Sequence, residues 1–114
     1  MQLADDDVRN ALAARRAAGV NVRVVLADTG WIPANADAAT FLAAHDIEAR
    51  QMKAPAVHVK AAVVDGQLAY AGSINLSWTS LTKNREVGLL VTEPANVTMM
   101  HDTFEKDWAT ATAF

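Results

Sequence analysis

The middle of the chain carries an imidazole, an ammonium, a hydroxyl and an amide at a spacing that could bind and attack a phosphate. His58 and Lys60 lie two residues apart in a β-branched stretch, so both side chains point to the same face of the expected strand. Residues 72–75 follow a turn and offer an anion close backbone approach and hydrogen-bond donors. The imidazole can serve as nucleophile or proton carrier. The candidate phosphate-binding residues are Lys60, Gly72, Ser73 and Asn75.

The full spacing, His-x-Lys-x4-Asp-x6-Gly-Ser-x-Asn, resembles the HKD motif of the phospholipase D superfamily without a substitution. Its six positions are His58, Lys60, Asp65, Gly72, Ser73 and Asn75. Six fixed positions recur by chance about once in 10⁷ to 10⁸ starts, so coincidence is a poor explanation. The following run, residues 84–89, resembles the second half of bacterial cardiolipin-synthase-like and phospholipase-D-like proteins.

The resemblance implies an enzyme that cleaves or transfers phosphodiesters without a metal or other cofactor. In this family a motif histidine attacks phosphorus, and water or an alcohol then resolves the phosphohistidine. On this chain His58 would be the nucleophile, while Lys60 and Asn75 would stabilise the charge of the five-coordinate state with help from Ser73. Glu86 would accept a hydrogen bond from His58 Nδ1 and so orient the ring.

Asp65 belongs to the motif and therefore to the catalytic candidates, but the residues themselves favour a structural role. It lies an odd number of residues from His58 and Lys60, which places it on the opposite face of an unbroken strand. Together with Gly66 it also forms a hairpin turn signal. We expect Asp65 to organise the turn and not to contact the substrate.

The remaining polar residues do not predict a metal site. The chain has no cysteine, and its three histidines are scattered without an i, i+4 pair, which argues against a set of metal ligands. We expect His45, His101 and Arg85 on solvated faces. Trp31 stays a candidate for the binding site because its Gly-Trp-Ile-Pro loop is apolar for an exposed segment.

The elements that must position these groups alternate between helix and strand. Acids at positions 5–7 and a glycine at position 19 bound a first helix, and the run Val20–Leu26 predicts a buried strand. Asn75 is suited to cap a short helix or turn at 76–81. Further expected elements are a helix from about Asp37 to His45, strands at Ile47–Met52, Val57–Val64, Leu68–Ala71 and Arg85–Thr92, and a closing helix from Pro94.

We therefore expect one α/β domain over residues 1–114. The element order favours a partly parallel sheet. The resemblance implies a phospholipase D-like mixed sheet flanked by helices, an α-β-α sandwich, without the family's usual first helix and strand. The buried face of the closing helix is predicted to consist of Val97, Met100, Phe104 and Trp108.

The composition limits the classes of partner that the chain is expected to bind. The 114 residues are 52% hydrophobic and 20% charged, as in one folded domain. Ten Lys and Arg against 13 Asp and Glu give a net charge of -3, which argues against a broad nucleic-acid face and favours phospholipid over nucleic acid. No stretch approaches the roughly 20 apolar residues of a membrane span, while peripheral membrane contact is compatible with the sequence. The compartment is not predicted.

One motif is half of what the family's active site requires, because two HKD motifs face each other there. The second motif would come from a symmetric homodimer mate or from the missing half of a longer chain, and we favour the longer chain. Two alternative functions stay open. One is an HKD endonuclease that acts on DNA or RNA as a homodimer, and the other is a non-catalytic half that completes a partner lobe.

Overall fold

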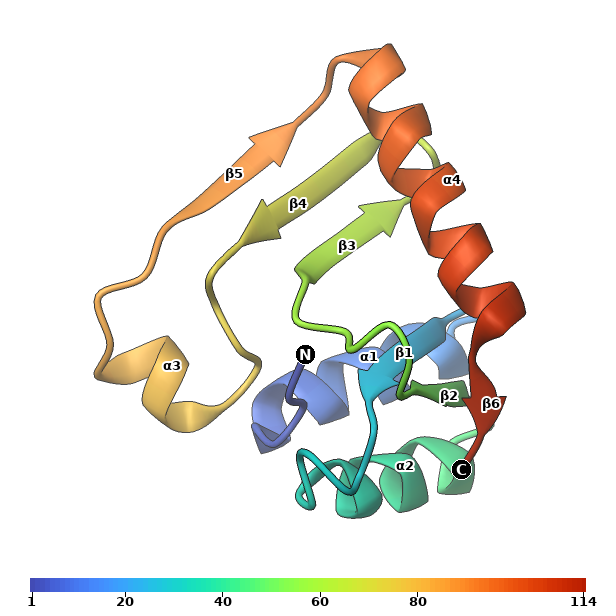
Figure 1. Ribbon diagram of the computed structural model, residues 1–114, viewed down its shortest axis with the longest axis vertical. Helices are drawn as coiled ribbons and strands as arrows, with labels where there is room; N and C mark the ends of the chain where they lie inside the picture. The colour runs from blue at the N-terminus through green and yellow to red at the C-terminus, as the bar shows by residue number, and fades with distance from the viewer.

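The strands of the molecule divide between two small sheets, and helices surround them (Figure 1). The computed structural model describes all residues, 1–114. Its elements are α1 (Asp6–Ala17), β1 (Arg23–Ala27), α2 (Asn35–Ala44), β2 (Glu48–Met52), β3 (Lys60–Val64), β4 (Leu68–Gly72), α3 (Trp78–Thr82), β5 (Gly88–Val91), α4 (Pro94–Thr110) and β6 (Thr112–Ala113).

The predicted α/β fold with a partly parallel arrangement of strands is confirmed, but the strands form two sheets. In the first sheet the order is β1-β2-β6, with β1 parallel to β2 and β6 antiparallel to β2. In the second the order is β3-β4-β5, and both pairs are antiparallel. The two sheets share no strand pair, since β1 pairs only with β2 and β3 pairs only with β4. Helix α4 contacts strands of both sheets and runs beside them (Figure 1).

The first and last helices begin where the expected signals lie. The Asp5 side chain caps α1 by accepting a hydrogen bond from Val8 N at 3.1 Å, which satisfies one of the free amides at the helix start. Gly19 follows the helix with φ at +91°, a conformation that glycine adopts without strain. Pro94 stands at the start of α4, where its missing N–H costs no hydrogen bond.

The main core lies between α2 and the first sheet. Its buried residues are Leu3, Val24, Leu26, Ala38, Leu42 and Ile47. Asn35 is fully buried beside this core, and its side-chain amide accepts from Leu3 N and donates to Ala27 O, so the polar group is satisfied. On α4, Val97 and Trp108 are buried and Met100 and Phe104 are half-buried. These positions confirm the predicted inner face of the closing helix.

Several expected boundaries differ from the structure, and three of them concern the segments around the motif. The strand predicted over Val57–Val64 begins only at Lys60, and the strand predicted over Arg85–Thr92 is limited to Gly88–Val91. The short helix starts at Trp78, and its N-cap is Ser77, which accepts a hydrogen bond from Ser80 N. Asn75 therefore does not cap it. The reason is local, because Ser77 stands three residues before a free helical amide and satisfies it directly.

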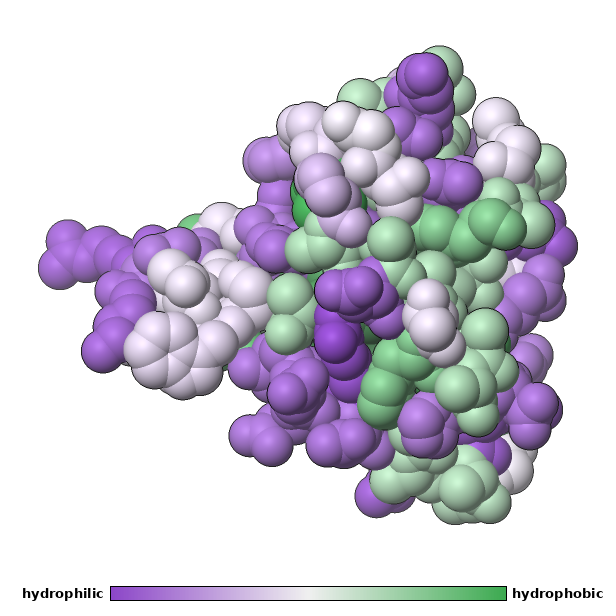
Figure 2. Space-filling model, turned by 90° about the horizontal axis from the view of Figure 1, so that it is seen from below, coloured by the Kyte–Doolittle hydropathy of each residue, from purple (hydrophilic) through white to green (hydrophobic).

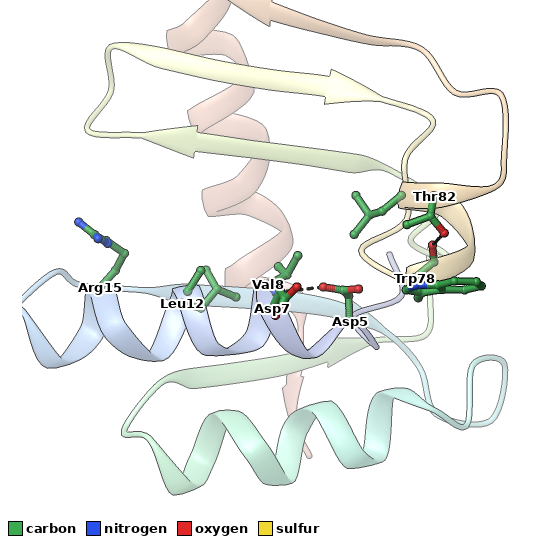
Figure 3. Close-up of a pocket in the computed structure, with 9 residues that line it drawn as sticks. Asp5, Asp7, Val8, Leu12, Arg15, Trp78 and Thr82 are labelled. Atoms are coloured by element: carbon green, nitrogen blue, oxygen red, sulfur yellow. Dashed lines mark hydrogen bonds between the residues drawn. The ribbon is translucent and has the colours of Figure 1, made fainter.

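A groove separates α1 from α3 (Figure 3). Its volume is about 560 Å³, and its apolar wall includes Val8, Leu12 and Trp78. From below, the α3 corner projects from the rest of the molecule, and polar and apolar residues are interspersed over this face (Figure 2). None of the helices combines the length and the apolar character needed to cross a membrane.

Candidate active site

The structure brings His58 and Lys60 together at the start of β3. Lys60 is the first residue of the strand and is buried, with 5% of its surface exposed. Its Nζ donates a hydrogen bond to His58 O at 2.8 Å and lies 3.0 Å from His58 Nε2. An ammonium has donors only, so this contact is a hydrogen bond when His58 Nε2 carries no proton and accepts. The imidazole itself is exposed and can meet a ligand.

Strand register places the two halves of the motif side by side. Lys60 pairs with Gly72 across β3 and β4, and Gly72 pairs with Gly88 across β4 and β5. A Cβ atom built on Gly72 would lie 2.5 Å from Val87 O. Gly72 is therefore required for the close approach of β4 to β5. That approach sets Ser73 immediately beyond the end of β4, on the side where Lys60 begins β3.

Glu86 organises the loops around Ser73. Its carboxylate accepts hydrogen bonds from Ser73 Oγ, from Ser80 Oγ and from Asn84 Nδ2, the last at 3.1 Å. These three donors hold the pKa of Glu86 below its ordinary value, because they stabilise the charged form. The expected hydrogen bond between Glu86 and His58 is not formed. Three other donors engage the carboxylate, which joins Ser73 to Ser80 and Asn84.

Asn75 is tied to this network through its backbone. Asn75 N donates to Ser80 Oγ at 3.0 Å, and Asn75 Oδ1 accepts from Gln2 N at 3.2 Å. Ser80 is buried and thus connects Asn75 to Glu86. Sequence reasoning did not include Ser80 or Asn84 among the candidates. No sequence motif points to Ser80, because its contacts with Asn75 and Glu86 form only when α3 packs against the loop.

Asp65 lies apart from the other motif residues. It occupies the β3–β4 hairpin turn with φ at +53°, next to Gly66 with φ at +63°, and Gln67 N donates to Val64 O at 3.0 Å. Two consecutive positive φ angles are typical of a type I′ turn, so the predicted turn is confirmed. The five residues of β3 span about 13 Å, and the turn lies at the end opposite Lys60.

The remaining candidate residues are three polar side chains and Trp31. His45, His101 and Arg85 are exposed, as predicted. No group of three or more His, Cys, Asp or Glu side chains is placed to hold a metal ion. Trp31 borders the candidate site, because its ring centroid lies 5.9 Å from that of His58.

Comparison with known proteins places the chain in a family. Residues 1–108 match the family model described as "Cardiolipin synthase, PLD-like domain". The chain belongs to this phospholipase D-like family. The predicted family is thereby confirmed, and the His58–Lys60 and Gly72–Ser73 segments described above lie within the matched part of this PLD-like domain.

Relatives of the PLD-like domain include proteins named for different substrates. The "5'-3' exonuclease PLD4" of Mus musculus is 35% identical over 77 residues, which are 62% of this chain and 15% of the relative. "Phospholipase D Z" of Dictyostelium discoideum is 30% identical over 112 residues, 92% of this chain and 26% of the relative. The chain thus spans between 15% and 26% of the length of these relatives.

A solved structure supports the fold of the PLD-like domain. The phospholipase D family member Nuc from Salmonella typhimurium superimposes with a TM-score of 0.89 at 24% sequence identity. The match covers 99% of this chain and 76% of Nuc. At that level of identity the likeness concerns the architecture, which agrees with the predicted phospholipase D-like fold.

Replacement of Glu86 by Gln in the PLD-like domain is expected to loosen the Ser73 and Asn75 loops. An amide has one acceptor oxygen and no charge, so it cannot replace a carboxylate that receives three donors. We expect the Asn75 amide to exchange its hydrogen about tenfold faster, because it donates to Ser80 Oγ, which Glu86 holds in place. Hydrogen exchange followed by NMR measures this. Glu93→Gln is the matched control, because Glu93 is exposed and its side chain makes no cap hydrogen bond.

The hydrogen bonds of Glu86 should make the stability of the Ser73 and Asn75 loops depend on pH, with a defined sign. Because the folded-state pKa of Glu86 is lowered, the stabilisation is complete above the ordinary pKa of a glutamate and is lost as the pH falls through the lowered value. The amide shifts of Asn75 and Ser80 should therefore move together on acidification in the wild type. They should not show this step in Glu86→Gln. Identical exchange and titration in the two proteins would contradict the role given to Glu86.

Proposed function

We propose that the chain is one half of a phospholipase D-type phosphodiesterase or phosphatidyltransferase in which His58 attacks the phosphorus of a phosphodiester. The observation that carries this proposal is the pairing of an exposed imidazole with a buried ammonium, His58 Nε2 and Lys60 Nζ at 3.0 Å. Membership in the PLD-like family supports the reaction class. Catalysis is proposed to need no metal or other cofactor.

The chemistry would run in two displacements. His58 Nε2 gives its lone pair to phosphorus, the P–O bond to the departing alcohol breaks, and a protonated group opposite donates a proton to the alcohol oxygen. Lys60 Nζ exchanges its contact with the ring for a phosphate oxygen and offsets the added negative charge. Water, or an alcohol in a transfer reaction, then attacks phosphorus, and the group opposite, which lost its proton in the first displacement, takes the proton of the attacking oxygen. The P–N bond breaks and His58 is restored.

Ser73, Gly72 and Asn75 are proposed to hold the phosphate with Lys60. Gly72 pairs directly with Lys60 in the sheet, which puts the loop that follows it beside the ammonium. Glu86 would keep that loop in place through its bonds to Ser73 and Ser80. Asp65 would act only on the hairpin, since β3 separates it from the phosphate site.

A second motif is required by proton balance. The attacking His58 must be neutral at Nε2, so the same ring cannot be the protonated acid of that step. We propose that a second HKD motif supplies this acid, either from a homodimer mate or from another half of a longer chain. Val59 and Val87, beside His58 and Glu86 in sequence, are 55% and 69% exposed. They provide apolar surface near the site for a partner to cover.

Phospholipid is the proposed substrate, because the net charge of -3 disfavours a long polyanion and the matched family model bears the name of cardiolipin synthase. Peripheral contact with a membrane would then deliver the lipid. Nucleic acid is the second candidate, and the observation that favours it is the relative named as an exonuclease. A non-catalytic half is the third.

Substrate choice and assembly can be tested together. We expect labelled phosphatidylglycerol in vesicles to be turned over with EDTA present, by a preparation whose mass in solution exceeds that of one chain or by this chain together with a second motif. Single-stranded DNA serves as the parallel substrate. Turnover of DNA alone would replace lipid by nucleic acid. Loss of lipid turnover in EDTA would contradict metal independence. An assembled but inactive preparation would favour the non-catalytic half.

A further inference from the structure

A hollow at one end of the first sheet lies next to His58 and is not used by the phosphate site. Its volume is about 360 Å³, and its walls come from the loops that follow β1 and β2. These strands are parallel, with Ala27 paired to Met52 at their carboxyl ends, and Asp28 N continues the ladder by donating to Met52 O. The crevice beyond the carboxyl ends of parallel strands is a common place for ligands in α/β proteins. The lining residues are Asp28, Gly30, Trp31, Met52, Lys53 and Ala56.

The position of the hollow connects it to the reacting group. The Trp31 ring forms one wall and is 5.9 Å, centroid to centroid, from the His58 ring, with 31° between the two planes. Ala56, on another wall, precedes His58 by two residues. The connection from β2 to β3 runs between the two sheets (Figure 1) and carries both Ala56 and His58. A substituent on a phosphate held at His58 would therefore reach the hollow.

The walls combine an apolar ring face with opposite polar functions. Trp31 is 50% exposed, although it is a large apolar side chain. Asp28 Oδ1 accepts a hydrogen bond from Gly30 N at 3.0 Å, which orients the carboxylate, while Oδ2 has no donor in the structure. Lys53 is exposed and forms no ion pair. A ligand can thus contact the indole with C–H groups, donate to Asp28 and receive a hydrogen bond from Lys53.

We propose that this hollow is the subsite for the alcohol portion of the phosphodiester and that it selects an alcohol with neighbouring hydroxyl groups, such as glycerol. Such a polyol presents C–H groups to the Trp31 ring, hydroxyl donors to Asp28 and hydroxyl acceptors to Lys53. An acyl chain would leave both charged groups of the hollow without partners. This inference rests on the proposed function, because it takes His58 as the residue that engages the phosphate.

Two lipids of equal charge test the selection. Phosphatidylglycerol and phosphatidylpropanol differ in the two hydroxyl groups of the head group, so they separate recognition of hydroxyls from recognition of the phosphate. The active assembly should turn over phosphatidylglycerol faster. Trp31→Ala and Asp28→Asn should each reduce its kcat/KM about tenfold and change that of phosphatidylpropanol less than twofold. The control Trp78→Ala, at an exposed tryptophan of α3, should leave both rates unchanged. Equal losses for both lipids, or no loss, would overturn the proposal.

A binding measurement keeps this inference separate from catalysis. Titration with glycerol phosphate should shift the NMR signals of the Trp31 indole N–H and the Gly30 amide together with those of His58. Propyl phosphate should shift those of His58 without the other two. Shifts at His58 alone with both probes would overturn the hollow and leave the proposed function standing. Absence of shifts at His58 with either probe would contradict the proposed function itself. A larger response of Trp31 to a dinucleotide than to glycerol phosphate would replace the polyol by a nucleobase.

Discussion

Phosphodiester turnover is expected to fall by about 10³-fold or more when His58 is replaced by Gln. Glutamine can still accept a hydrogen bond from Lys60 Nζ, which in the wild type lies 3.0 Å from His58 Nε2. It has no nucleophilic nitrogen, so the covalent step is removed while the contact is kept. Because His58 is exposed, the substitution should not disturb the core. The initial rate on labelled phosphatidylglycerol measures the loss.

Trapping experiments make the prediction for His58 sharper. Rapid acid-free quenching of the active wild type should leave labelled phosphate on His58 that is stable to base and released by acid. The control His45→Gln removes an exposed histidine at the end of α2 and should keep both the rate and the adduct. An active preparation without an adduct, or a His58→Gln protein of wild-type rate, would refute His58 as the nucleophile.

Substitution of Lys60 by Met is expected to lower kcat by about 10²–10³-fold, the usual effect of removing one donor that stabilises transition-state charge. The ammonium is buried at the start of β3 and makes its bonds to His58. Methionine has a similar length and is compatible with burial, so the fold should survive. Lys60→Arg should recover little of the activity, because the planar guanidinium is larger and fixes its donors differently.

The readout for Lys60 must separate chemistry from folding. Thermal unfolding of Lys60→Met should give a midpoint equal to or above that of the wild type, since a buried charge is replaced by an apolar group. Lys106→Met, on the exposed side of α4, is the matched control for loss of one positive charge. Wild-type kcat in Lys60→Met, with an intact fold, would show that the ammonium does not act on the reaction.

Local signals were sufficient for most of the fold. The Asp5 cap, the Asp65–Gly66 turn and Pro94 at the start of α4 each act within a few residues, and sequence patterns report such short-range effects well. Strand lengths were less predictable. The expected strand at Val57–Val64 loses its first three residues because only the part from Lys60 finds a partner in β4, and pairing is a property of two strands.

The separation of the strands into two sheets also depended on tertiary pairing. Every strand except β6 was predicted near its observed place. The residues of a single strand do not determine which of its edges will pair with another strand. In the structure β1 and β3 each have one partner. Hydrogen bonds between strands join residues far apart in sequence, so the number of sheets is decided when the chain packs.

For the site, the sequence by itself determined the reactive groups and their pairing along the chain. The spacing His-x-Lys predicts both side chains on one side of an extended strand. In the structure His58 lies just before β3, and its Nε2 is 3.0 Å from Lys60 Nζ. Only the tertiary structure decided the partners of Glu86, which are Ser73, Ser80 and Asn84 in place of His58. A carboxylate binds the donors that packing brings nearest, and that proximity arises where α3 and β5 meet the loop after β4.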